Sequence, residues 1–162
     1  MAGDLSRDWE RFVTTFEPKA FSARLNASTE RALGRVGFTA VREARRLIKA
    51  RSYEKNADAT KRRKGSTVPL VDKGDLFGSV GTGIREVSGE APEAILGANK
   101  RTPGGVNLAA VLHEGVKNKS GQGWRIPPRE FLVRPAESSA VARSMDIEAA
   151  RAIHEAVTGR GQ

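Results

Sequence analysis

One continuous helical pattern constrains the fold of this chain more than any other feature of its sequence. From Pro18 to Arg51, with one missed turn near Thr29, apolar residues recur at steps of three and four. They are Phe21, Leu25, Leu33, Val36, Ala40, Ala44, Leu47 and Ile48. At 1.5 Å per residue this helix is about 51 Å long, whereas a compact domain of 162 residues is about 40 Å across. The helix therefore either breaks or overhangs its domain, in which case another subunit must cover it.

Two glycines mark the place where this helix is expected to break or to pack closely. Gly34 and Gly37 lie one turn apart, and each costs a helix up to about 1 kcal/mol relative to alanine. Helices kink at such positions, or use them to let another element approach closely. The sequence leaves both alternatives open.

The flanking segments divide the chain into three parts. Leu5, Trp9, Phe12, Val13 and Phe16 have helical spacing, which predicts a short helix or arm in residues 1–17. Residues 18–158 are expected to form a single domain, which ends in a helix over 136–157, and residues 159–162 a frayed tail. The expected buried face of that last helix carries Val141, Met145, Ala149, Ile153 and Ala156/Val157.

The middle third of the chain contains short apolar runs separated by turn residues, which is typical of short strands. Apolar runs in 76–87 and 92–98 flank the turn residues Ser88-Gly89-Glu90, which predicts two antiparallel strands. Asn107 suits the N-cap of a helix over 108–114, and Gly115 suits its C-terminal end. A further strand is expected at 124–126, before Pro127. We therefore predict an α+β fold, in which a long N-terminal helix and a C-terminal helix pack on a small antiparallel sheet.

The positive charge of the chain is concentrated in one segment. The net charge is +9, and residues 42–64 hold ten basic residues against three acidic ones, hence seven of the nine charges. The basic residues are Arg42, Arg45, Arg46, Lys49, Arg51, Lys55, Lys61, Arg62, Arg63 and Lys64. Residues 52–69 have almost no apolar content and are predicted to be an extended basic loop or arm. The segment is interpreted as a solvated helix end, a phosphate contact or a docking surface for an acidic protein; with Tyr53 as its sole aromatic residue, it does not suggest base stacking.

The sequence offers no set of residues for catalysis. It has no cysteine, and its two histidines, in His113-Glu114 and His154-Glu155, have no third ligand at metal spacing. The glycines at 78, 81 and 83 match no phosphate-binding loop. We expect no enzymatic activity, no metal and no cofactor. Residues 1–10 do not resemble a secretory signal, and no apolar run is long enough to span a bilayer.

Three short segments occur in an order that is typical of one group of proteins. Residues 69–80 follow the pattern of a proline, then D-x-G-x-L, then S-[IV]. Residues 108–115 are similar to an A-x-x-x-H-E-x-G segment with slightly different spacing, and 126–132 to I-P-x-R-x-F-L. The residues that carry these patterns are Asp72, Gly74, Leu76, His113, Glu114, Gly115, Ile126, Pro127, Arg129 and Phe131. In this order they resemble the tail-completion and head–tail joining proteins of tailed bacteriophages, also called neck or virion morphogenesis proteins. The chain departs from the pattern at Asn107-Leu108 and Gly115-Val116, where aromatic residues are usual, and at Glu130.

The resemblance implies a structural virion protein of a phage or prophage, without enzymatic activity. It implies a homo-oligomeric ring, commonly a hexamer, at the neck or tail end, with the head connector on one side and tail-tube or terminator proteins on the other. The protein would be found in the virion, and in the host cytoplasm during assembly, with no membrane or small-molecule partner. Its basic arm would clasp a neighbouring protein or face DNA in the lumen.

The motif residues are then expected to serve the fold. Glu114, close to a helix C-terminus, needs a cationic partner, and Arg129 is the expected one. Ile126 and Phe131 are expected to anchor their loop in the core. The alternative function is that of a small basic nucleic-acid-binding protein that uses residues 42–64.

Overall fold

The computed structural model describes residues 9–50, 53, 75–86, 92–122 and 124–159. Its elements are α2 (Pro18–Lys49), α4 (Asp75–Ser79), β1 (Val80–Arg85), β2 (Glu93–Ala98), α5 (Leu108–Glu114), β3 (Val116–Lys117), β4 (Trp124–Ile126), α6 (Val133–Ala136) and α7 (Ser139–Thr158). Residues 9–14 are also helical. The predicted α+β class is confirmed. Among the described helices, none has the length and apolar character needed to cross a membrane.

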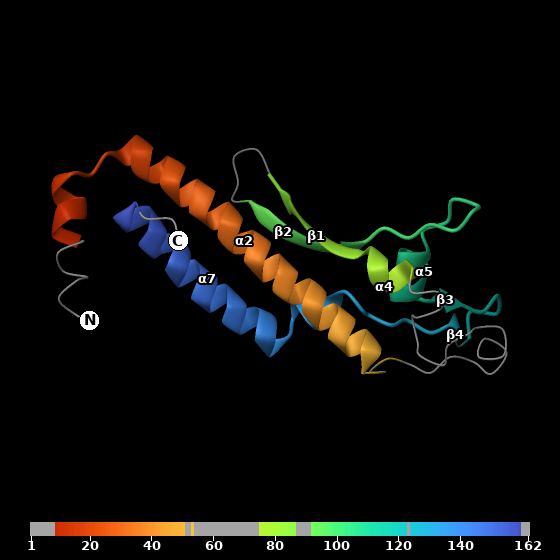
Figure 1. Cartoon of the computed structure of the whole chain (residues 1–162). Coiled ribbons are helices and arrows are strands. Elements are labelled where there is room, and N and C mark those ends of the chain that lie inside the picture. Colours follow the sequence, from red (N-terminus) through yellow and green to blue (C-terminus); the bar gives the residue numbers. More distant parts are fainter. Residues whose placement is uncertain (1–8, 51–52, 54–74, 87–91, 123, 160–162) are drawn as a thin grey trace.

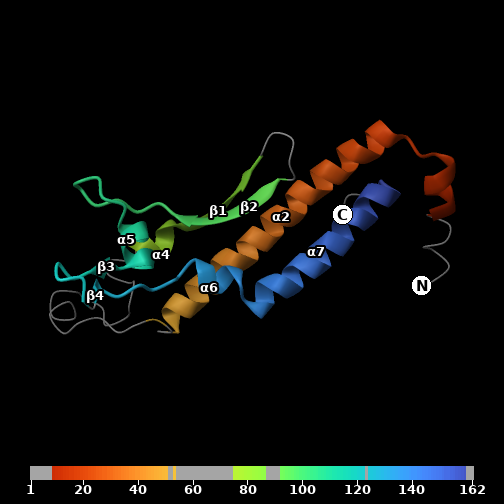
Figure 2. The ribbon, with the colours of Figure 1, turned by 180° about the vertical axis from the view of Figure 1, so that it is seen from behind.

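Helix α2 is the spine of the molecule. It runs without interruption for 32 residues, with α7 along one side and the β1–β2 hairpin along the other (Figures 1 and 2). Between the two alternatives for Gly34 and Gly37, the structure therefore has close packing and no break. A Cβ atom on Gly37 would lie 2.2 Å from Oγ1 of Thr82 in β1, whereas one on Gly34 would meet nothing within 4 Å. Only Gly37 is required by the contact with the sheet.

Strands β1 and β2 form a regular antiparallel pair, in register from Val80 opposite Ala98 to Arg85 opposite Glu93. The pairing confirms the predicted hairpin, but the first strand begins later than expected because α4 occupies residues 75–79. The short strands β3 and β4 form a second antiparallel pair. Ile84 and Ile95 in the hairpin remain about 40% exposed. This part of the hairpin therefore has no apolar partner on the described chain that covers it fully, and a two-stranded hairpin has little stability when it is not packed against other elements.

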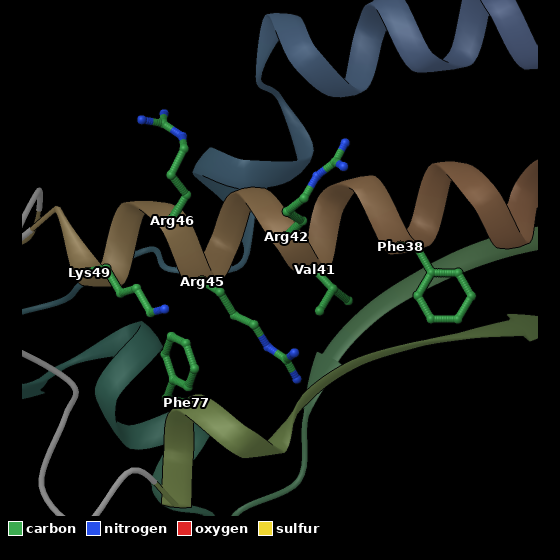
Figure 3. Close-up of a pocket in the computed structure, with 7 residues that line it drawn as sticks. All are labelled: Phe38, Val41, Arg42, Arg45, Arg46, Lys49 and Phe77. Atoms are coloured by element: carbon green, nitrogen blue, oxygen red, sulfur yellow. The ribbon is translucent and has the colours of Figure 1, made fainter.

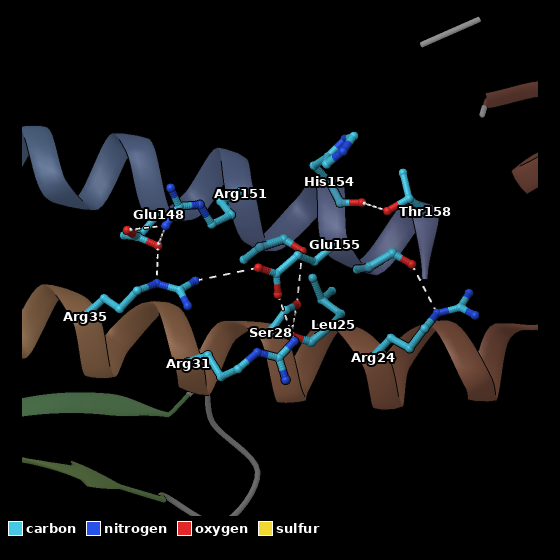
Figure 4. A network of polar contacts seen from close by, with 12 residues as sticks. Arg24, Leu25, Ser28, Arg31, Arg35, Glu148, Arg151, His154, Glu155 and Thr158 are labelled. Atoms are coloured by element: carbon cyan, nitrogen blue, oxygen red, sulfur yellow. Dashed lines mark hydrogen bonds and ion pairs between the residues drawn. The ribbon is translucent and has the colours of Figure 1, made fainter. Parts of the chain in front are cut away.

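Helix α7 is joined to α2 by polar contacts (Figure 4). Oγ of Ser28 donates a hydrogen bond to the carbonyl oxygen of Ala152 at 3.0 Å. Nη2 of Arg31 lies 2.8 Å from Oε2 of Glu155, and Nε of Arg35 lies 2.5 Å from Oε2 of Glu148. The hydrogen bond from Arg31 lowers the pKa of Glu155, against the opposing effect of its burial. These pairs allow two carboxylates to be buried between the helices.

The buried face of α7 is not the one that its apolar pattern predicts. The helix itself is confirmed, with Ser138 as N-cap and Gly159 at its left-handed C-terminal position. Of the predicted face, Val141 and Ala156 are buried, whereas Met145 and Ile153 are more than half exposed. The helix is turned so that Glu148 and Glu155 meet the arginines of α2. The apolar residues Met145, Ile147 and Ile153 are left exposed on this chain.

The core lies at the C-terminal half of α2. Phe131, Ile48 and Ala44 are fully buried there, and Val80 is 1% exposed. They pack with Val41, Tyr53, Leu76 and Ala109. A smaller cluster of Val36, Ala40 and Val141 continues the core between α2 and α7 and touches Leu96 of the hairpin.

The contact at Gly37 gives a test of the packing of α2. Gly37→Ala places a methyl group against the Thr82 side chain, and we expect a loss of about 1–3 kcal/mol in the free energy of unfolding. The matched control, Gly34→Ala, has open space and is expected to gain up to about 1 kcal/mol. Thr82→Ala in the Gly37→Ala background should recover part of the loss. Equal effects of the two glycine substitutions in thermal or denaturant unfolding would contradict this packing.

Candidate interaction surface

The second and third motif segments meet beside the core. The edge of the His113 ring packs against the Phe131 ring, with centroids 5.6 Å apart. The backbone N–H of Arg129 donates a hydrogen bond to the carbonyl oxygen of His113 at 3.3 Å. Gly115 ends α5 with φ of 78°, and a Cβ atom there would lie 2.7 Å from the Ile126 oxygen and from the Pro128 nitrogen. The two segments therefore fit together only with glycine at position 115.

The first motif segment reaches the same core through Leu76, which is 5% exposed and packs in one cluster with Phe131. Asp72 and Gly74 lie outside the described residues. Ile126 and Pro127 are half-buried, and Phe131 is fully buried, as expected for anchors of the loop. Leu76 and His113 thus pack with the buried Phe131, whereas Glu114 is exposed.

The two histidine–glutamate pairs differ in their surroundings. Nδ1 of His113 is buried without a hydrogen-bond partner in the described part of the chain. The expected ion pair between Glu114 and Arg129 is not formed: Glu114 is exposed, and Arg129 is buried and engaged elsewhere. His154 is exposed on α7. No group of three potential metal ligands occurs in the ranges that the structure describes.

The four described basic residues of the segment 42–64 line an open groove of about 600 Å³ between α2 and α4 (Figure 3). Its residues are Phe38, Val41, Arg42, Arg45, Arg46 and Lys49 from α2, and Phe77 from α4. We call it the basic–aromatic groove. Arg51, Lys55, Lys61, Arg62, Arg63 and Lys64 lie outside the described residues.

Two cations of the groove are held by an aromatic ring. The Arg45 guanidinium carbon lies 5.6 Å and the Lys49 Nζ lies 5.4 Å from the centroid of the Phe77 ring. Nη2 of Arg45 also donates to the carbonyl oxygen of Val80 at 3.2 Å. These contacts fix Arg45 and Lys49 along the side of α2 that faces α4 (Figure 3). The attraction between a cation and the face of an aromatic ring stabilises this arrangement.

The other two cations lie on the other side of α2 (Figure 3). Arg46 forms a bidentate pair with Glu43, with distances of 2.7 and 2.6 Å. The hydrogen bond from Arg46 lowers the pKa of Glu43, so this cation is already neutralised. Arg42 is exposed and forms no ion pair with any described residue. Within the described residues, Arg42, Arg45 and Lys49 thus form no ion pair, and of these Arg45 and Lys49 lie on the side of α2 that faces α4 (Figure 3).

The sequence analysis did not predict that Phe38 and Phe77 would lie beside the basic residues. Tyr53, the only aromatic residue within 42–64, is 6% exposed and belongs to the core, where burial raises its pKa to about 12. Phe38 is 70% exposed. It lies off the apolar stripe of α2, so the helical pattern alone indicates that it is an exposed aromatic residue. Phe77 reaches the groove from another element, so no local pattern indicates it.

Comparisons of the chain with protein families, with curated proteins and with solved structures found no match. Three features of the described residues bear on the function of the chain. They are the packed motif segments, the exposed apolar side of α7, and the basic–aromatic groove.

The fit of the two motif segments can be tested at Gly115. Gly115→Ala should cost about 3 kcal/mol or more of stability, because it adds both a strained φ and a clash with the Ile126–Pro128 backbone. Gly121 has φ of 74° but open space around it, so Gly121→Ala should cost only about 1–2 kcal/mol for the backbone. A Gly115→Ala variant as stable as Gly121→Ala in denaturant unfolding would show that the segments do not pack this closely.

Proposed function

We propose that the chain is a structural protein of a tailed-phage or prophage particle. It forms a homo-oligomeric ring, a hexamer by resemblance, at the neck or tail end and joins or completes the head–tail assembly. The observation that carries the proposal is the packing of the three motif segments. Leu76 and Phe131 belong to the buried core, His113 packs on the Phe131 ring, and Gly115 admits the Ile126–Pro128 backbone. A group of proteins defined by assembly, with no reaction to catalyse, needs its shared residues for such a purpose.

The exposed apolar residues support self-association. Most of them lie in three places on the described chain: residues 9–16, the β1–β2 hairpin, and the outer side of α7. These are Trp9, Val13 and Phe16; Ile84 and Ile95; and Met145, Ile147 and Ile153, while Phe38, Val106, Trp124 and Val133 are exposed elsewhere. Apolar surface spread over several faces suits a subunit that contacts neighbours on more than one side. The further partners would be the head connector and the tail-tube or terminator proteins.

The second candidate function is nucleic-acid binding, favoured by the four cations on the last turns of α2. Its support is weaker, because Arg46 is paired with Glu43 and Arg45 bonds to the Val80 carbonyl. A DNA-binding protein should keep measurable affinity near physiological salt and lose it steeply with salt, in proportion to the number of phosphates contacted. A ring subunit with DNA in its lumen needs only weak contact.

The proposal is tested by disruption of the gene in the phage or prophage that encodes it. We expect the lysate to contain separate heads and tails in electron micrographs, and the intact chain supplied from a plasmid to restore joined particles. The matched control is the chain with Ser120→Ala, an exposed turn position outside the surfaces proposed for self-association, which should restore joining equally well. Joined, infectious particles in the absence of the chain would contradict the proposal. Tight, steeply salt-dependent DNA binding together with such particles would favour the alternative.

A further inference from the structure

The groove and the N-terminal aromatic residues lie at opposite ends of α2. Trp9, Phe12, Phe16 and Phe21 stack as one cluster, with neighbouring centroids 5.0–5.6 Å apart. Trp9 and Phe16 are nevertheless 57% and 46% exposed. Figure 1 shows this helical segment beyond the N-terminal end of α2, while α4, which contributes Phe77 to the groove, lies toward the other end. Each end of the spine thus carries an uncovered aromatic surface.

The two surfaces are complementary in charge. The basic–aromatic groove is lined by Arg42, Arg45 and Lys49 and by Phe38 and Phe77. The charged groups of Arg45 and Lys49 point toward Phe77, and that of Arg42 lies on the other side of α2 (Figure 3). Residues 1–17 carry four acidic residues against two arginines, and Glu10 and Glu17 are exposed beside the aromatic cluster. An N-terminal segment with a surplus of acidic residues and an exposed aromatic cluster therefore matches a cationic groove lined by aromatic rings.

The N-terminal helix cannot reach the groove of its own chain. Phe38 lies 20 residues along α2 from Pro18, which is about 30 Å at the helical rise. With residues 9–14 helical and 15–17 extended, Trp9 can extend only about 20 Å from Pro18. Arg45 and Phe77 lie farther still. A helix that occupies the groove must come from another molecule.

We propose that the N-terminal aromatic helix of one copy of the chain docks into the basic–aromatic groove of the next. This inference rests on the proposed ring and names its contact. Because the two surfaces differ, the contact is head-to-tail, and repetition of a head-to-tail contact closes a ring when the rotation between copies allows it. The overhang of α2 beyond its domain is what brings one end of each copy to its neighbour.

The absence of cysteine from the chain makes site-specific crosslinking clean. Thr14 is exposed on the N-terminal helix, and Gly78, next to Phe77, has room for a side chain. The full chain with Thr14→Cys is mixed with the full chain with Gly78→Cys and treated with a short bismaleimide, which bridges wider gaps than a disulfide. We expect a crosslinked dimer from this mixture, and a ladder of linked copies from the double variant. The matched control replaces Gly78→Cys with Gly104→Cys, an exposed position in the loop before α5 and outside the surfaces proposed for self-association, and should give no dimer above background.

A second arm tests the charge of the groove. Adding Lys49→Glu and Arg42→Glu to the Gly78→Cys chain should lower the crosslink yield about tenfold, whereas Arg143→Glu, on exposed α7, should leave it unchanged. The inference is overturned by no dimer, by an internal crosslink within a monomer of the double variant, or by crosslinking that appears only when DNA is added. If the chain forms a ring but the Thr14→Cys and Gly78→Cys positions do not crosslink, the proposed contact is overturned and the proposed ring is not. A crosslink in a chain whose loss leaves phage particles joined overturns only the proposed function.

Discussion

The close packing of α2 with two elements on its opposite sides is the constraint on which the rest of the structure depends. Gly37 has no side chain, so the Thr82 side chain of β1 can sit against the helix backbone. On the other side, the small residues Ser28 and Ala32 are buried beside α7. The hairpin and α7 are thereby fixed relative to one helix, and that helix is long enough to project beyond both. The interaction surfaces proposed for the chain lie at its two ends.

The sequence predicts the elements whose signals are local. Pro18 and the apolar stripe locate α2, Asn107 and Gly115 locate α5, and the turn residues between two apolar runs locate the hairpin. The buried side of α7 was not predictable from its own pattern. Glu148 and Glu155 are buried because Arg35 and Arg31, more than a hundred positions earlier in the chain, neutralise them. Ion pairs between distant segments outweigh the apolar period of a single helix.

The candidate site was likewise predicted only in part from the sequence. The concentration of charge in residues 42–64 is visible in the sequence, but its pairing is not: Glu43 neutralises Arg46, while Phe77 from α4 stacks with Arg45 and Lys49. The groove exists only after α4 is packed beside α2. Likewise, the motif patterns indicate which residues matter, but not that Gly115 must accept the Ile126–Pro128 backbone at close range. The prediction that Arg129 pairs with Glu114 was wrong, because Arg129 is buried whereas Glu114 is exposed.

The central claim is that the chain works as an assembled ring and not as a single molecule. The most direct measurement is the mass of the purified full chain over a dilution series, by sedimentation velocity or native mass spectrometry. A closed ring predicts one species at a fixed multiple of the 17.5 kDa chain mass, a hexamer by the resemblance, which persists with nuclease present and does not grow as concentration rises. A monomer at every concentration would contradict the account.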